Sequence, residues 1–202
     1  MTAPGSDSSN GTSPTLLARL RVAEPSAWNR VVHVYSPLVF AWCRRTGLSS
    51  DDSADVLQEV WCAVAKAVDR FDGAAPGATF RGWLYTITRR KQADYFRAAS
   101  RRPLAEGGSS AQGRWAELPE QEPDDSFADL RTGHAGVMRR AIECIRQDFE
   151  PITFRAFWAT AIEGRSAKEV SDTLGVTQAV VYQSKSRVLR RLKSEFQGLM
   201  KS

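Results

Sequence analysis

The sequence is poor in side chains that bind metals or react covalently. Its 202 residues include only two histidines, His33 and His134. The three cysteines, Cys43, Cys62 and Cys144, lie far apart and form no Cys-x-x-Cys pair. We therefore predict no metal site and no other cofactor, and the odd cysteine count fits a reducing compartment.

Long apolar segments are also missing. The longest mostly apolar run, 31–43, is too short to span a bilayer and contains polar residues. Residues 1–14 lack the basic start and apolar centre of a signal peptide. Their Ser, Thr, Gly, Asn and Pro content instead predicts a disordered tail. We therefore expect a cytoplasmic protein without membrane insertion.

Charge is distributed unevenly, although the formal net charge is only +5. Residues 1–78 carry a net charge of −1 and residues 79–102 carry +6, whereas residues 103–134 carry −5 and residues 135–202 carry +5. The two basic blocks favour a polyanion such as nucleic acid as a partner. The acidic block between them needs a separate explanation.

Helical periodicity runs from Thr15 to about residue 100, and no stretch shows the sustained alternation of a strand. The clearest stripe, after candidate N-caps at 49–51, consists of Val56, Val60, Val64 and Val68. Pro37 is expected to kink or divide the preceding helical segment. Gly and Pro predict a loop at 72–78, and Thr79 is a candidate cap for the next helix.

Residues 102–134 are rich in Gly, Pro and acids and have no periodicity, which predicts a linker. A second helical block begins near Ala135 and continues to about Phe196. The predicted fold is therefore all-α. It has two small helical domains, at 15–101 and 135–202, joined by a flexible acidic linker.

The second block contains the pattern of a helix-turn-helix. Ser166 and Glu169 form a capping box, Gly175 supplies a turn, and Thr177 caps the next helix. The predicted buried stripe of that helix consists of Val181, Val188, Leu189 and Leu192. Its predicted exposed face consists of Gln178, Tyr182, Gln183, Ser186, Arg187, Arg190 and Arg191. Early polar residues suit base edges and later cations suit phosphates. The alternative is an ordinary helical hairpin with solvated arginines.

In the first block, aromatic and cationic residues interleave at 80–97. This pattern suits single-stranded nucleic acid, because aromatic rings stack on bases while arginines follow the backbone. At helical spacing, however, most of these aromatics also fit a hydrophobic core. The preceding helix has an acidic start, including Asp51 and Asp55, which either favours the helix dipole or forms a docking face for a basic partner.

Together these segments resemble the extracytoplasmic-function (ECF) sigma factors of the sigma-70 family, over most of 15–100 and 135–197. Residues 52–61 look like the helix that binds core RNA polymerase, with its Asp, Leu-x-Gln-Glu-Val and aromatic pattern. Residues 80–97 look like the promoter-melting helix. Residues 164–187 look like the domain that reads the −35 element.

The resemblance implies a non-enzymatic factor with sigma region 2 at 15–101 and sigma region 4 at 135–202. It implies that the coiled coil of the largest polymerase subunit contacts Asp52, Asp55, Gln58, Glu59 and Trp61. It implies that single-stranded −10 DNA contacts Phe71, Asp72, Phe80, Arg81, Trp83, Arg89, Arg90, Lys91, Asp94 and Arg97. It implies that duplex −35 DNA contacts Thr177, Gln178, Tyr182, Gln183, Ser186, Arg187 and Arg190.

Three further interpretations stay open. The acidic linker is either a solvated spacer or an occupant of the polymerase channel that later carries RNA. An anti-sigma factor is a candidate partner, because such proteins commonly hold this family inactive, but no docking motif for one is recognisable. A helix-turn-helix regulator that does not bind polymerase explains the second block alone. An enzyme acting on nucleic acid lacks support, because the acids at 51–59 have no partner motif.

Overall fold

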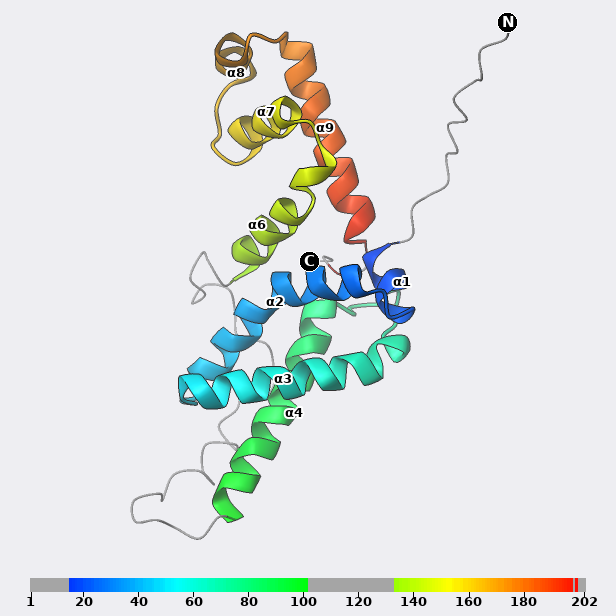
Figure 1. Cartoon of the computed structure of the whole chain (residues 1–202), viewed down its shortest axis with the longest axis vertical. Coiled ribbons are helices and arrows are strands. Elements are labelled where there is room, and N and C mark those ends of the chain that lie inside the picture. The colour runs from blue at the N-terminus through cyan, green and yellow to red at the C-terminus, as the bar shows by residue number, and fades with distance from the viewer. Residues whose placement is uncertain (1–14, 102–132, 198, 200–202) are drawn as a thin grey trace, which may run out of the picture.

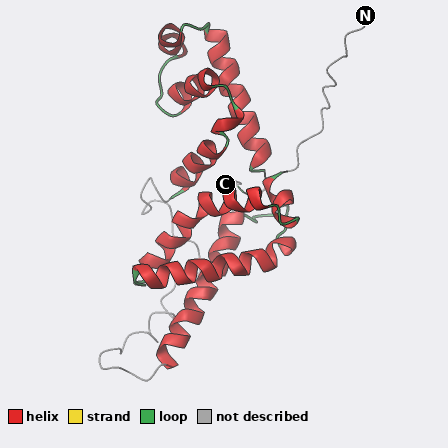
Figure 2. Ribbon diagram, in the orientation of Figure 1, coloured by secondary structure: helices red, strands yellow, loops and turns green. Residues whose placement is uncertain are grey.

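The computed structural model describes residues 15–101, 133–197 and 199, so the predicted tail and most of the predicted linker lie outside the described part. Within these residues all regular structure is helical, as Figure 2 shows. The all-α prediction is therefore confirmed. None of the described helices is both long and apolar enough to cross a membrane. The described residues also contain no group of three side chains that could hold a metal ion.

The first group of helices comprises α1 (Leu16–Arg21), α2 (Pro25–Arg45), α3 (Ser50–Ala67), the 3-10 helix η1 (Val68–Arg70) and α4 (Phe80–Arg101). Helix α3 packs against both α2 and α4 (Figure 1). Of the three candidate caps at 49–51, Ser49 caps α3 by accepting a 3.1 Å hydrogen bond from the amide of Asp52. Thr79 likewise accepts a 3.0 Å bond from the amide of Gly82 at the start of α4.

Helix α2 continues through Pro37, so the helical segment is not divided there. The neighbouring side chains Tyr35 and Leu38 are buried in the core on either side of the proline. Proline costs a helix one hydrogen bond, and burial of these side chains offsets that loss. The four predicted stripe valines of α3 and η1 are all buried as well.

The second group comprises α6 (His134–Cys144), the 3-10 helix η3 (Arg146–Asp148), α7 (Pro151–Ala161), α8 (Ala167–Leu174) and α9 (Gln178–Glu195). Helix α6 begins one residue before the predicted boundary. A small cluster of buried residues joins α7, α8 and α9, namely Ala156, Ala159, Val170 and Val181. In Figure 1, α9 runs from the α8 end of the molecule down to α1.

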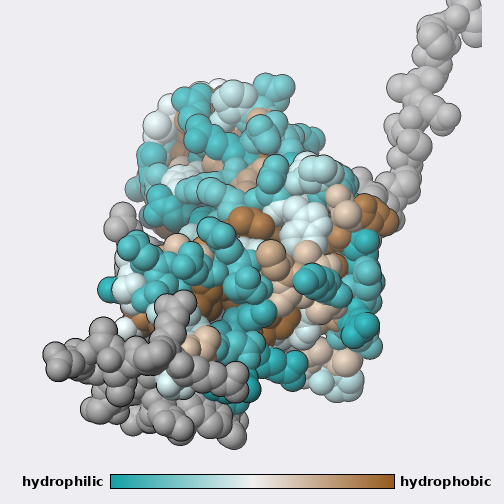
Figure 3. Space-filling model, turned by 60° about the horizontal axis from the view of Figure 1, so that its bottom comes forward, coloured by the Kyte–Doolittle hydropathy of each residue, from teal (hydrophilic) through white to brown (hydrophobic). Residues whose placement is uncertain are grey.

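The two groups are in direct contact. One hydrophobic cluster contains side chains from α1 to α4 and also from α6, α7 and α9. Helix α2 packs against α6. Hydrophilic residues cover much of the face shown in Figure 3, and hydrophobic residues form patches among them. The arrangement therefore joins the two sequence blocks through a shared core.

Candidate nucleic-acid interface

The helix-turn-helix begins at the predicted capping box. The Ser166 hydroxyl accepts a 3.2 Å hydrogen bond from the amide of Glu169, and the Ser166 amide donates a 2.9 Å bond to the Glu169 carboxylate. These bonds satisfy amides that a helix start otherwise leaves without partners. Hydrogen bonds from the backbone and the side chain of Ser166 also lower the pKa of Glu169.

The turn between α8 and α9 depends on Gly175. This residue has φ 65°, in the left-handed region that favours glycine. The next amide, of Val176, donates a 3.1 Å bond to the carbonyl of Ser171. The Thr177 hydroxyl then accepts a 3.3 Å bond from the amide of Val180 and caps α9. The predicted glycine turn and threonine cap are therefore both present.

Helix α9 separates a buried face from an exposed one. Its buried residues include Val181, Ser184, Val188 and Leu192. All the predicted −35 residues are exposed, namely Thr177, Gln178, Tyr182, Gln183, Ser186, Arg187 and Arg190. The aromatic ring of Tyr182 is notable because 63% of the residue is accessible to solvent. Hydrogen-bonding groups and cations thus share one solvent-facing surface of the helix.

Two predicted positions on α9 are wrong. Leu189 is not in the buried stripe, because 44% of it is exposed. Arg191 is not on the exposed face, because its guanidinium pairs with Asp148 at 2.9 Å and with Glu195 at 2.6 Å. Each helical residue advances by about 100°, which turns Leu189 away from Val188 and brings Arg191 beside the buried face.

The exposed face of α9 is electropositive. Within the described residues, no acidic side chain forms an ion pair with Arg187 or Arg190. Lys185 is exposed on the same helix. Cations without acidic partners attract phosphate groups and release counterions on binding.

A second candidate surface surrounds a cavity of about 300 Å³ between η1 and the start of α4. Its walls are formed by Arg70, Phe71, Asp72, Gly77, Ala78, Thr79, Gly82 and Trp83. The Asp72 carboxylate accepts a 2.9 Å bond from the amide of Ala74, which shapes the loop. Gly77 has φ 72°. The predicted −10 residues Phe71, Asp72 and Trp83 therefore lie around one cavity.

The aromatic side chains around this cavity belong mainly to the hydrophobic core. Phe80 is fully buried, and its ring centroid lies 5.6 Å from that of Phe71 and 5.2 Å from that of Tyr35. Trp83 lies 5.0 Å from Phe71 and is half-buried at the cavity wall. Among Phe71, Phe80 and Trp83, the ring of Trp83 is therefore the most accessible, and the rings of Phe71 and Phe80 pack against it.

The remaining predicted −10 residues follow α4 away from the cavity. Arg81 and Arg89 are half-buried and Arg90 is exposed. The Lys91 ammonium lies 3.1 Å from the Glu59 carboxylate. Further along α4, Asp94 and Arg97 pair with each other at 2.5 Å. The structure thus places these residues on one helix but not in one pocket.

The predicted polymerase-docking residues lie on α3. Asp55, Gln58 and Glu59 are exposed. The Asp52 carboxylate accepts a 2.6 Å bond from the Ser49 hydroxyl and so supports the helix start. The indole of Trp61 donates a 3.0 Å bond to the Ser36 hydroxyl and packs against the core. The first three side chains therefore form the accessible part of this surface.

The sequence prediction omitted several residues that form the cavity wall. Arg70 and Gly82 are among them. The Gly and Pro content of 72–78 indicated a loop, and the structure adds that this loop and the start of α4 line one cavity. Leu189 was also omitted from the exposed face of α9.

Comparison with known proteins shows what this chain is similar to, independently of the structure. Residues 31–102 match the family Sigma-70 region 2. The chain is also similar to the ECF RNA polymerase sigma factor BldN of Streptomyces coelicolor. The two sequences are 23% identical over 189 residues, which is 94% of this chain and 67% of that relative. The family match thus covers most of α2 and all of α3 and α4, and the similarity to the relative extends over both groups of helices.

Proposed function

This chain belongs to the sigma-70 family as a sigma factor of the ECF type, and from that premise we propose that it binds core RNA polymerase, recognises −10 and −35 promoter elements and promotes DNA melting. As a sigma factor, it is a transcription initiation factor and not an enzyme. Domain 2, defined as residues 15–101, would act at the −10 element. Domain 4, defined as residues 135–202, would act at the −35 element.

For the −35 element, we propose that α9 enters the major groove of duplex DNA. Gln178, Tyr182 and Gln183 lie in its N-terminal half, where a recognition helix contacts base edges. Arg187 and Arg190 lie further along and would contact phosphates. The support for this assignment is the shared exposure of these side chains, together with a capped turn that fixes the helix.

For the −10 element, we propose that the 300 Å³ cavity accepts an unstacked base of the non-template strand. The half-buried Trp83 supplies an aromatic surface and Arg70 a cation at the cavity wall. Arg90 and Lys91 would hold the backbone of the same strand. Such a pocket compensates for the unstacking energy of a flipped base.

For polymerase, we propose that the exposed residues Asp55, Gln58 and Glu59 of α3 contact the coiled coil of the largest subunit. An acidic surface complements a basic partner and speeds encounter. Asp52 and Trp61 would act by holding the helix, through their bonds to Ser49 and Ser36. An anti-sigma factor as an additional partner stays a prediction.

The observation that carries the proposal is the presence on one chain of a sigma-70 region 2 match and a separate helix-turn-helix with an exposed, cationic second helix. A helix-turn-helix regulator that does not bind polymerase would need no acidic docking surface on α3. Binding to core polymerase therefore separates the two functions.

The test uses the full-length protein, purified core RNA polymerase, and run-off transcription on a promoter library. We expect stable binding and new start sites. The variant D55R/E59R should lose core binding, with its helical content unchanged by circular dichroism. The matched control E163R/D172R makes the same change in charge at exposed positions of domain 4, and it should bind core normally. Unaltered core binding by D55R/E59R would remove the assigned docking surface.

A further inference from the structure

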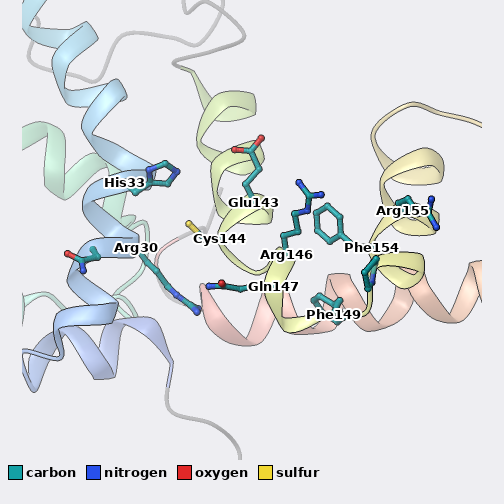
Figure 4. Close-up of a pocket in the computed structure, with 11 residues that line it drawn as sticks. Arg30, His33, Glu143, Cys144, Arg146, Gln147, Phe149, Phe154 and Arg155 are labelled. Carbon is teal, nitrogen blue, oxygen red and sulfur yellow. The ribbon is translucent and has the colours of Figure 1, made fainter.

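A cleft of about 620 Å³ lies between α2 and the segment that runs from the end of α6 to the start of α7. Pockets that hold small organic ligands typically have volumes of about 300–1,000 Å³. Arg30 and His33 of α2 lie on one side of the cleft, and Cys144, Arg146 and Gln147 lie on the other (Figure 4). Side chains that are far apart in the sequence therefore converge on one space of ligand size.

The charge of Arg30, on the α2 side, is already neutralised. Glu195 at the end of α9 is only 1% exposed. Its carboxylate accepts hydrogen bonds from Arg30 at 2.7 Å and from Arg19 at 2.9 Å. A carboxylate is stable in such a buried position only when cations compensate for its lost hydration. Arg30 therefore shapes this wall of the cleft, but the attraction for a charged ligand comes from other residues.

Positive charge on the opposite side has no such compensation. Arg146 and Arg155 are both exposed, and within the described residues no acidic side chain forms an ion pair with either of them. The acidic residue of the lining, Glu143, pairs with Arg139 at 3.3 Å. Guanidinium groups without an acidic partner bind phosphate and carboxylate groups through pairs of N–H donors. The cleft therefore favours an anionic ligand.

Aromatic rings orient one of these arginines and add apolar surface. The guanidinium carbon of Arg146 lies 5.6 Å from the centroid of the Phe154 ring, and that ring stacks with Trp158 at 5.9 Å. A guanidinium held on the face of a ring keeps the N–H donors at its edge for a ligand. The half-buried ring of Phe149 and the ring of Pro151 belong to the same lining. An anion site therefore adjoins a surface on which a flat apolar group can pack.

Asn29 and Gln147 add carboxamide side chains to the lining. Each carries a donor and an acceptor side by side, the pattern that pairs with the edge of a nucleobase such as adenine. Guanidinium groups for phosphates, apolar surface for a flat ring and carboxamides for the edge of that ring together complement a nucleotide.

We propose that this cleft binds a small nucleoside phosphate, a role that goes beyond the proposed promoter function. The phosphates pair with Arg146 and Arg155, and the base packs on Phe149 beside Gln147. The site is separate from the proposed DNA surfaces, because none of its lining residues belongs to the predicted −10 or −35 set.

The first test is isothermal titration calorimetry of the full-length protein with ATP, GTP, CTP and UTP in turn, without divalent cations. Charge-assisted contacts together with apolar packing predict a dissociation constant of about 100 μM or tighter for at least one of them. Tripolyphosphate and the matching nucleoside should each bind at least about tenfold more weakly, because each lacks part of the contacts. Weaker binding than this by all four nucleotides, or equal binding of tripolyphosphate, would overturn the proposed ligand.

Alkylation of cysteine locates the bound nucleotide. Cys144 is half-buried and lines the cleft, whereas Cys62 is exposed on α3 and serves as the internal control. At about ten times its dissociation constant, the nucleotide should slow iodoacetamide modification of Cys144 by about tenfold and leave Cys62 unchanged. Peptide mapping by mass spectrometry measures both rates. Protection of neither cysteine, or of both, would overturn the site, and equal protection of Cys144 by a single-stranded oligonucleotide would replace the small ligand with a nucleic-acid strand.

Substitutions separate the two parts of the site. R146A and R155A should each weaken the binding of nucleotide and of tripolyphosphate by about tenfold or more, since each removes hydrogen bonds to a charged group. Q147A should weaken the binding of nucleotide and leave that of tripolyphosphate unchanged. The matched control R165A removes the same charge at an exposed position outside the lining of this cleft, and it should bind nucleotide as the wild type does.

Circular dichroism checks that every variant keeps its helical content. Wild-type affinity in both R146A and R155A would overturn the phosphate assignment. An equal loss of affinity in R165A would show unspecific attraction of anions and would overturn the site as well. These measurements use neither polymerase nor a promoter, so their outcome is independent of whether the proposed sigma function holds.

Discussion

Replacement of Gln183 by alanine tests the assignment of α9 most directly. The residue is exposed in the N-terminal half of the helix, next to Tyr182 and on the opposite side from the buried Val181. Loss of an exposed side chain changes protein stability by only about 0.5 kcal/mol or less. Loss of a bidentate contact to a base costs about 1–3 kcal/mol of discrimination. The −35 duplex should therefore bind about 5- to 150-fold more weakly.

The assay is fluorescence anisotropy with a duplex that the wild-type protein has selected from a random pool. Each base pair is then changed in turn. The wild type should discriminate strongly at the position that Gln183 contacts, and the Q183A variant should discriminate weakly there and normally elsewhere. Equal weakening on every duplex would refute the base contact, and a lowered unfolding temperature would refute the claim that the residue serves DNA alone.

Two further predictions follow from burial. The variant V188A should lower the free energy of unfolding by about 2–3 kcal/mol because Val188 is fully buried. The variant L189A should lower it by less than about 1 kcal/mol. Equal losses of the two variants in urea denaturation would contradict the corrected orientation of α9. Iodoacetamide at pH 8 should modify Cys62 in the native protein and spare Cys43, because burial raises the pKa of the Cys43 thiol to about 11 and keeps it protonated. Peptide mapping by mass spectrometry measures this difference, and modification of native Cys43 would show that its burial is transient.

Local signals in the sequence predicted most helix boundaries correctly. Ser49, Thr79, Ser166 and Thr177 are all caps in the structure, and Gly175 has the left-handed backbone that a turn requires. These features depend on hydrogen bonds between residues three or four positions apart. Because such bonds are short-range, they can be predicted from the residue types and their spacing alone.

Contacts between residues far apart in the sequence could not be predicted in the same way. Glu195 looks like an ordinary surface acid near a helix end, and only the docking of α9 on α1 and α2 places two arginines around it. Spacing likewise suggested that Phe80 could be core or a stacking residue, and its burial depends on Tyr35, which is 45 positions away. The candidate docking, −10 and −35 residues stay predictions from the resemblance, although most of those on α3 and α9 are exposed as that function requires.

Because α9 is anchored at its C-terminal end, a small rotation there moves its N-terminal end by a larger distance. Its last turn is held by the bonds of Glu195 to Arg19 and Arg30, and its N-terminal end lies about 27 Å away. A rotation of about 10° at the anchored end moves the N-terminal end by about 5 Å, which exceeds the 3.4 Å rise of a base pair. Under the proposed −35 assignment, a substitution that tilts the last turn by this angle would change which base pair the first turn meets, although the substituted residue lies far from any base.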